Sequence, residues 1–416
     1  MVSMIFEGLR IVDLTMGWAG PLSTMLFADF GAQVIKIEGP GRLDWWRRGS
    51  ASKPPPDMRD VDAKVWERSA LFCGVNRNKL GVTLDMSSPQ GREIFERLVA
   101  VSDVVVESFS PRVMKKWGLD HERLAEINPG IIMMSLPAVG SSGPWAHYIG
   151  YASTTEAMSG LPALCGYDDA PILQTPFVAD PLGGLNGATA LAFALYHREL
   201  TGEGQRIEVG QHEGLIPLIG HGLMEYQLTG EIPARSSTGD SRFAPNGCYP
   251  CQGDDRWVVI SVATDDEWIK FCGATGRPEL LADPALRTAQ GRQENRGRID
   301  DLTSEWTRQH DRRDAMEILQ RAGVVAAAVN NAADLLEDPQ VTATEGFVEL
   351  DRAVVGRHPY PRVSVRLSET PGNAAEPAPL FGEDNDFVLR EILGLRDDEV
   401  RELRELGVVA ETPMLN

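Results

Sequence analysis

The chain has 416 residues, of which 43% are hydrophobic, and a formal net charge of −20. This composition is typical of a globular protein with one large or two smaller domains, and its acidity argues against duplex nucleic acid and membrane surfaces as partners, since both attract basic faces. Residues 1–116 nevertheless carry 16 Lys and Arg against 14 Asp and Glu, a net +2, so the remaining chain carries −22. We therefore expect an anionic ligand to bind through this N-terminal quarter.

The sequence predicts neither a membrane span nor a signal peptide, and its cysteine content agrees with a cytoplasmic location. No stretch approaches the roughly 20 apolar residues of a membrane span, and the first residues lack the basic and apolar regions of a signal peptide. Five cysteines are few for this length, so we expect a cytoplasmic protein. Cys248 and Cys251 form a C-x-x-C pair, but no second Cys/His pair follows at zinc-ligand spacing. We expect two structural cysteines and no metal site.

The N-terminal half alternates strands with helices. Residues 9–14 predict a short strand, a turn with two glycines follows at 17–21, and residues 22–30 have apolar positions at helical spacing. The pattern continues with strands at 33–38, 82–85, 104–106 and 131–136 and helices at 89–100, 112–117 and 185–196. Such alternation predicts a parallel α/β fold of Rossmann type over residues 1–200.

Several nucleotide and hydrolase signatures are missing from this pattern. The first turn is not G-x-G-x-x-G, and neither G-x-x-x-x-G-K-[ST] nor G-x-S-x-G occurs. A nicotinamide dinucleotide site, a P-loop and a hydrolase nucleophile are therefore unsupported.

The second half shifts in composition. We expect residues 1–205 to form the N-terminal part of a large domain, 206–247 a linker rich in Gly, Pro, Ser and Arg, and 248–330 a smaller α+β domain. Residues 331–416 would be a second linker and a return to the large domain, with helices at 384–394 and 397–406.

A series of short motifs runs through the whole chain in one order. Each alone is weak; together they resemble the class III CoA-transferases of CaiB/BaiF type, which include formyl-CoA, carnitine and benzylsuccinate CoA-transferases and 2-methylacyl-CoA racemases. The motifs are GLRIVDL at 8–14, AGP at 19–21, ADFGAQVIKIE at 28–38, NRNK at 76–79, VESFSP at 106–111, DPLGG at 180–184, RELTGEGQ at 198–205 and PLFGE at 379–383.

The resemblance implies a fold and an assembly. It implies a Rossmann-like large domain built from both chain ends, a smaller middle domain, and an interlocked homodimer. Some relatives have two different subunits, so a heteromer is the alternative.

Asp180 occupies the position of the family's catalytic aspartate. Transfer of CoA between acids needs a carboxylate nucleophile that attacks the thioester and forms a mixed anhydride. The small residues Gly183 and Gly184 permit close approach of a substrate, and their amides could hold an oxyanion. Without the resemblance, an Asp before a Gly/Ala-rich helix is more often an N-cap.

The racemase branch instead pairs this aspartate with a histidine in a Gly-His-Asp stretch. Here that stretch reads Gly150-Tyr151-Ala152, which favours a transferase with Tyr151 against the acyl group. His147 lies four positions earlier and would need a shifted loop to substitute. Glu156 stands where many members have Gln, and its simplest interpretation is an exposed helix carboxylate.

CoA itself needs cations for its phosphates and apolar walls for adenine and pantetheine. The motif positions predict that CoA contacts Ala19, Arg77, Lys79, Ser108, Phe109, Arg112 and Lys116. Ser108 stands where Asn is commoner in the family, and Trp18 replaces the Gln that formyl-CoA transferase uses near its active site. Formyl or oxalyl specificity is therefore not expected, and a larger acyl group is, with Trp18 in the substrate site. The basic run between Arg42 and Lys53 could form a mobile substrate-facing loop.

The expected function is CoA transfer from an acyl-CoA, with succinyl-CoA as the candidate donor, to a carboxylic acid, with CoA as a substrate moiety and no other cofactor. A 2-methylacyl-CoA racemase and a CoA-ester-binding subunit of a heteromeric transferase are the alternatives.

Overall fold

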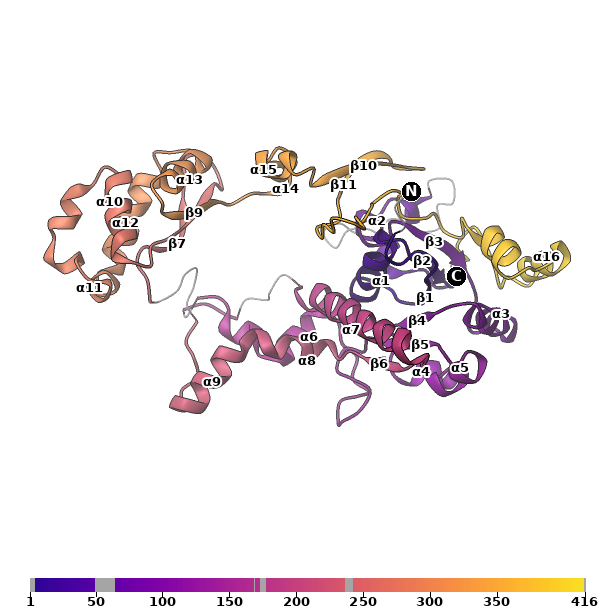
Figure 1. Ribbon diagram of the computed structural model, residues 1–416. Coiled ribbons are helices and arrows are strands. Elements are labelled where there is room, and N and C mark those ends of the chain that lie inside the picture. The colour runs from indigo at the N-terminus through magenta and orange to yellow at the C-terminus, as the bar shows by residue number, and fades with distance from the viewer. Residues whose placement is uncertain (1–3, 49–63, 168, 173–176, 236–241, 415–416) are drawn as a thin grey trace. The chain divides into compact units, whose positions relative to one another are not determined.

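The chain folds into two compact units. The computed structural model describes residues 4–48, 64–167, 169–172, 177–235 and 242–414 (Figure 1). The larger unit contains three segments of the chain: the residues up to Leu161, a middle segment that ends at Gly220, and the residues from Gln340 onward. The smaller unit contains His221–Pro339 and a short segment that begins at Pro162.

The larger unit is built on a six-stranded sheet with the order β3-β2-β1-β4-β5-β6, in which every pair is parallel. The strands are β1 (Arg10–Asp13), β2 (Gln33–Glu38), β3 (Lys79–Thr83), β4 (Val104–Glu107), β5 (Ile132–Ser135) and β6 (Arg206–Glu208). This order is that of a doubly wound Rossmann sheet. The α/β prediction is confirmed, although β3 begins three residues before the predicted strand.

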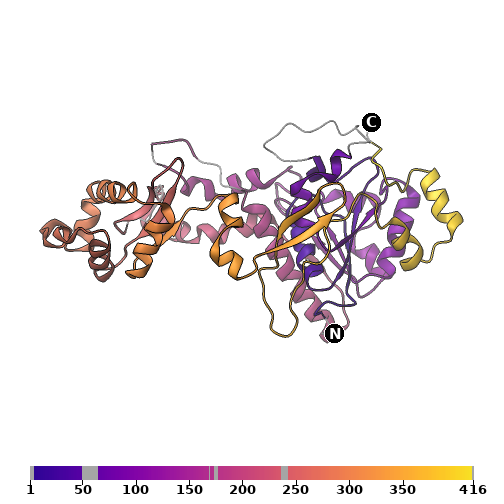
Figure 2. The same ribbon diagram turned by 90° about the horizontal axis from the view of Figure 1, so that it is seen from above.

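Helices cover both faces of this sheet because its strands are apolar on both faces. In β1, Ile11 packs in one buried cluster with α1 (Ala19–Asp29) and α7 (Ala179–Thr201). Its neighbour Val12 packs in another cluster with α3 (Pro89–Ala100), α4 (Arg112–Trp117), α5 (His121–Ile127) and α16 (Asp397–Glu405). The two helical layers are visible in Figures 1 and 2.

The C-terminal segment closes the β3 edge. The backbone N–H of Gly81 donates to the Asp384 carboxylate at 2.7 Å, and that of Thr83 donates to the Asn385 amide oxygen at 2.9 Å. A π-helix, Phe387–Ile392, and α16 follow where two α-helices were predicted. Side chains thus satisfy edge amides that would otherwise offer a template for strand addition.

Shorter elements complete the larger unit. They are α2 (Ala70–Val75), α6 (Ala152–Ser159), α8 (Gln211–Leu215) and the antiparallel pair β10 (Phe347–Arg352) and β11 (Gly356–Pro361).

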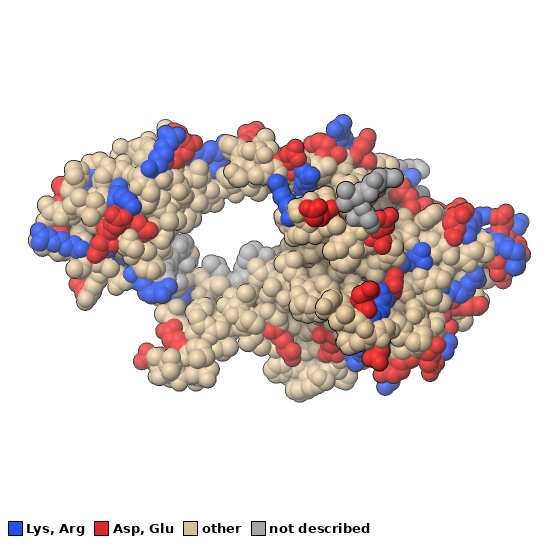
Figure 3. All heavy atoms as spheres, in the orientation of Figure 1, with Lys and Arg blue, Asp and Glu red and all other residues tan. Residues whose placement is uncertain are grey.

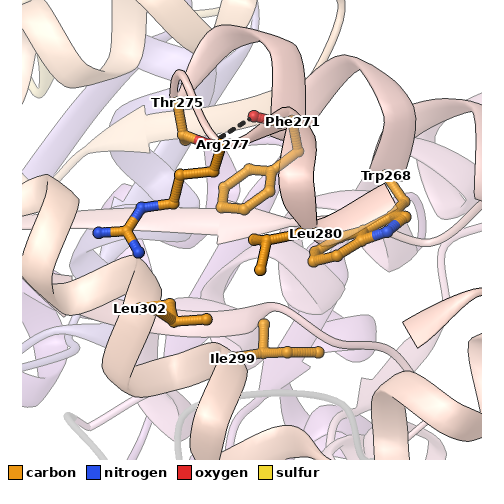
Figure 4. Close-up of a pocket in the computed structure, with 7 residues that line it drawn as sticks. All are labelled: Trp268, Phe271, Thr275, Arg277, Leu280, Ile299 and Leu302. Atoms are coloured by element: carbon orange, nitrogen blue, oxygen red, sulfur yellow. Dashed lines mark hydrogen bonds between the residues drawn. The ribbon is translucent and has the colours of Figure 1, made fainter. Parts of the chain in front are cut away.

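The smaller unit has an antiparallel sheet of order β7-β8-β9, with β7 (Asn246–Pro250), β8 (Trp257–Ser261) and β9 (Val325–Ala328). Its helices include α10 (Asp265–Ala274), α11 (Ala289–Glu294), α12 (Arg296–Thr307), α13 (Arg312–Arg321) and α14 (Ala332–Leu336). Figure 4 shows a small, mostly apolar pocket between α10 and α12, lined by Trp268, Phe271, Leu280 and Ile299 among others. No predicted site residue lines it.

The helix α9 (Gly220–Thr229) belongs to the smaller unit from His221 onward, and α15 (Pro339–Ala343) belongs to the larger unit from Gln340 onward. Cys248 and Cys251 are free thiols, and burial raises the pKa of both, to about 11 for Cys251. Both are therefore weak nucleophiles at neutral pH.

Charges on the C-terminal helices are mixed in sign. Arg404 pairs with Asp386 and Glu411, and Arg396 pairs with Asp398, so blue and red side chains alternate around α16 in Figure 3. Among the described residues, no helix combines the length and apolarity that a membrane crossing requires.

Candidate active site

The order of the strands changes direction between β1 and β4. Strands are added outward from β1 on one side and from β4 on the other, so the loops after these two strands diverge. In open α/β sheets ligands bind at this point, outside the carboxyl ends of the strands. The loop after β1 carries Trp18 and leads to Ala19 at the start of α1, and the loop after β4 carries Ser108 and Phe109. Four predicted site residues therefore lie at the switch point.

A network of buried charges fixes the loop after β1. Asp13 accepts hydrogen bonds from the hydroxyls of Thr15 and Thr24, at 2.5 and 2.6 Å, and from Lys79 Nζ at 3.0 Å. Burial opposes ionisation of Asp13, but Lys79, Lys36 and the two hydroxyls outweigh it and hold its pKa well below the usual range. The loop that presents Trp18 is therefore tied to the end of the strand.

Two predicted CoA ligands, Arg77 and Lys79, lie inside such networks. Lys79 Nζ also donates to the Pro21 carbonyl and the Asn76 amide oxygen, and burial, partly offset by Asp13, lowers its pKa to about 8. Arg77 makes two hydrogen bonds to the Asp29 carboxylate, at 2.6 and 2.9 Å. Both cations already have carboxylate partners, so any contact with CoA phosphates would have to compete with Asp13 and Asp29.

The other two predicted cations are placed differently. Arg112 begins α4 and Lys116 lies in its last turn, and both side chains are exposed. Within the described part of the chain neither makes an ion pair. Of the four predicted phosphate ligands, these two are the ones whose charge is available at the surface.

A cavity of about 200 Å³ adjoins this region at the ends of β4 and β5. Its lining combines apolar side chains with polar and charged ones, and Phe109, Met114 and Lys115 contribute to it. The ring of Phe109 also contacts Trp117, with centroids 5.4 Å apart. The cavity therefore has an aromatic wall beside a cationic helix.

Asp180 lies in the first turn of α7, which begins at Ala179. The helix was predicted to start only at Leu185, and the N-cap position belongs to Val178, so the N-cap interpretation of Asp180 is wrong. The prediction missed residues 179–184 because Pro181, Gly183 and Gly184 have low helix propensity. Proline is favoured in the first turn of a helix, where its missing N–H has no helical partner.

The two glycines bring this turn close to its neighbours. A Cβ on Gly184 would lie 2.7 Å from the Ala19 carbonyl oxygen, and one on Gly183 would lie 3.1 Å from Gln211 Cγ. Asp180 is one turn before Gly184 on the same side of α7. Close packing of α7 on α1 therefore places Asp180 beside the helix start that carries Trp18 and Ala19.

The surroundings of Asp180 disfavour its charged form. Burial, and next the negative charge of Glu156, raise its pKa to about 6. Among the residues that the structure describes, none donates a hydrogen bond to this carboxylate. Asp180 is therefore ionised at neutral pH, and the described part of the chain provides no hydrogen bond that would stabilise this charge.

Glu156 is the residue that sequence reasoning underestimated. It is fully buried rather than exposed, and its Oε1 accepts the backbone N–H of Ala179 at 3.0 Å. The sequence contained one indication, a carboxylate at a position where relatives of this type have an amide.

Aromatic side chains connect Trp18 to Tyr151. The ring of Trp18 contacts Trp46 at 5.4 Å, Trp46 contacts Trp45 at 5.8 Å, and Trp45 contacts Tyr151 at 6.3 Å. Trp45 and Tyr151 are exposed, whereas Trp46 is buried. Exposed aromatic edges of this kind can bind an apolar acyl chain.

The basic run that contains these tryptophans is only partly what was predicted. Residues Trp45–Arg48 form a 3-10 helix, and Arg47 is fully buried, where it pairs with Glu38 and Glu67 at 2.8 Å each. This part is therefore anchored, and Lys53 lies outside the described residues. His147 is exposed, and no interaction of its side chain is found within the described ranges.

Comparison with known proteins identifies the class. The sequence profile of CoA-transferase family III matches residues 6–385, so the chain belongs to this family and is an enzyme of the CoA-transferase class. It is 32% identical to a succinyl-CoA–D-citramalate CoA-transferase of Chloroflexus aurantiacus, over 97% of this chain and 98% of that protein.

Two further relatives bear on assembly and fold. The chain is 32% identical to the α subunit of a succinyl-CoA–L-malate CoA-transferase of Chloroflexus aurantiacus, over 97% of this chain and 92% of that protein. The crystal structure of a CaiB/BaiF family protein from Brucella suis superposes with a TM-score of 0.83 at 30% identity, covering 94% of this chain and all of that one.

Proposed function

We propose that the protein transfers CoA from an acyl-CoA to a carboxylic acid, with Asp180 as the nucleophile. The observation that carries this proposal is a carboxylate without a hydrogen-bond donor among the described residues, held beside the helix start that follows β1. Its pKa of about 6 keeps it ionised at neutral pH and more basic than an ordinary aspartate. A desolvated anion of this kind is an activated nucleophile.

The reaction proceeds through covalent intermediates on Asp180. Its carboxylate oxygen attacks the thioester carbonyl carbon, the C–S bond breaks, and CoA leaves as the thiolate with a mixed anhydride on Asp180. The thiolate then attacks the Asp180 carbonyl, which releases the donor acid and leaves an aspartyl-CoA thioester. The acceptor acid repeats the two steps in reverse order and leaves as the new acyl-CoA, so protons and electrons balance without a further cofactor.

We assign residues to the parts of the acyl-CoA according to the solvent exposure of their side chains. We place the CoA phosphates on Arg112 and Lys116, and the aromatic wall at Phe109 beside the adenine. Trp18, Trp45 and Tyr151 would contact the acyl group, and Ala19 and Ser108 would form close backbone walls. Gly183 and Gly184 pack on Gln211 and Ala19 and would contribute by letting α7 approach α1. Arg77 and Lys79 would act on CoA mainly by holding the loops in place. Succinyl-CoA is the first donor to test because relatives are named for it.

Trapping the intermediate tests this proposal. The enzyme incubated with succinyl-CoA and then with borohydride or hydroxylamine should carry a reduced or hydroxamate adduct on the peptide that contains Asp180, read by mass spectrometry. Absence of an adduct in an enzyme that turns over would overturn the mechanism. Exchange of the α-proton with deuterated water in the absence of any acceptor acid would favour the racemase alternative, against which Tyr151 argues.

Assembly is a separate proposal. We infer a homodimer, because the long helix α7 exposes Leu185, Phe193, Tyr196 and Leu200, the last three with 67–71% of their surface accessible. An apolar stripe of this length is typical of a covered interface. Light scattering of the purified chain should give twice the monomer mass. A monomer that binds CoA without turnover would instead support a subunit of a heteromeric transferase.

A further inference from the structure

The contact between Glu156 and the start of α7 extends the proposed function, on which this inference rests. The first residues of a helix have backbone N–H groups without helical partners. Val178 provides no side-chain cap for α7, but the Glu156 carboxylate, on the separate helix α6, accepts the N–H of Ala179. Ala179 is itself fully buried and directly precedes Asp180.

This corner is buried and contains few charges. Ala152 of α6, Ala179 of α7 and Leu215 of α8 pack in one buried cluster. The helix α1 has no charged residue before Asp29 at its C-terminal end. The charged residue of α6 is Glu156, and the titratable residues of α8 are His212 and Glu213. Of these groups, Glu156 is the one whose charge acts on Asp180.

We propose that Glu156 is a positioning residue for Asp180: its hydrogen bond fixes the first turn of α7, and its negative charge favours the covalent intermediate over the free carboxylate. The free enzyme holds two neighbouring negative charges. Formation of the anhydride or the aspartyl thioester removes the charge of Asp180, and the repulsion disappears. An amide at position 156 could form the hydrogen bond but would not provide this effect.

The variant Glu156→Gln separates the two roles, since it keeps the acceptor oxygen and removes the charge. We expect the protonation midpoint of Asp180 to fall by up to about one pH unit, because the like charge that helps to raise it is removed while burial, the larger cause, remains. One pH unit corresponds to a factor of ten, so the fraction of enzyme trapped as the Asp180 adduct should fall up to about tenfold. Glu156→Ala, which also loses the acceptor, should lower kcat at every pH.

Carbodiimide labelling of Asp180 against pH, read by peptide mass spectrometry, measures the midpoint without turnover. It therefore tests the coupling of Glu156 to Asp180 independently of trapping. Failed trapping together with a shifted midpoint would overturn the proposed function and leave the coupling standing. Glu213→Gln, an exposed carboxylate on α8, is the matched control and should leave the midpoint unchanged. An unshifted midpoint in Glu156→Gln, with native circular dichroism, would overturn the inference.

Discussion

Asp13 and Asp180 are two carboxylates of the same unit with opposite surroundings. Asp13 accepts hydrogen bonds from Thr15, Thr24 and Lys79, and its pKa lies well below the ordinary value. Asp180 has a carboxylate neighbour and no donor among the described residues, and its pKa is raised. A buried charge with enough partners stabilises a loop, whereas one without partners stays reactive. The hydrogen-bond donors around a buried carboxylate thus distinguish a structural charge from a reactive one.

The largest expected effect is on catalysis. Asp180→Ala removes the proposed nucleophile, and we expect kcat to fall by about 10³-fold or more, since the carboxylate that forms the anhydride is lost. The assay is formation of the new acyl-CoA from succinyl-CoA and an acceptor acid, read by mass spectrometry. A variant that retains a tenth of the wild-type rate would show that Asp180 is not the nucleophile.

The corresponding change at the other carboxylate should act on folding. Asp13→Asn leaves the Lys79 ammonium buried without its ion-pair partner, and such a loss costs about 3–5 kcal/mol of unfolding free energy. Urea unfolding at pH 7 measures it. Because the folded-state pKa of Asp13 is depressed, the stabilisation is full above the ordinary value of 3.8 and is lost only as the pH falls through the folded-state pKa. Unchanged stability at pH 7 would contradict the structural assignment.

The same logic predicts that Asp180 weakens the fold. Its pKa is raised above the ordinary 3.8 to about 6, so the folded state binds the proton more tightly and loses stability as the pH rises through this window. Asp180→Asn, which cannot ionise, should therefore have a free energy of unfolding about 3 kcal/mol higher at pH 8. At pH 4, where the folded-state carboxyl is already protonated, the gain should be less than about 1 kcal/mol. An equal effect at both pH values would indicate a packing change instead.

The sheet could be predicted from the sequence because its strands are short, apolar and separated by helices of ordinary length. The first turn of α7 could not be predicted, because Pro181, Gly183 and Gly184 have low helix propensity inside a helix, yet the close approach to Ala19 requires the absence of a side chain at Gly184. Local propensity was overridden by packing between elements far apart in the chain.

The site residues divide in the same way. Motif order indicated which residues to consider, but it could not distinguish Arg77 and Lys79 from Arg112 and Lys116, since all four are cations in similar motifs. Their difference arises from Asp13 and Asp29, whose side chains meet those of Lys79 and Arg77 only in the folded chain. The burial of Glu156 likewise depends on the packing of α6 against α7 and α8.

The smallest expected effect separates these cations. Lys116→Ala and Arg112→Ala each remove an exposed charge from α4, so we expect KM for the acyl-CoA to rise about three- to tenfold, with more effect at low salt, and kcat and stability to remain unchanged. Arg77→Ala is the contrasting variant: it leaves Asp29 buried without its bidentate partner and should lower the urea midpoint. The opposite outcome is a raised KM and a native urea midpoint in Arg77→Ala, together with normal acyl-CoA binding by the two α4 variants. It would place the phosphate site at Arg77, near β3, and would reverse the division between structural and ligand-binding cations.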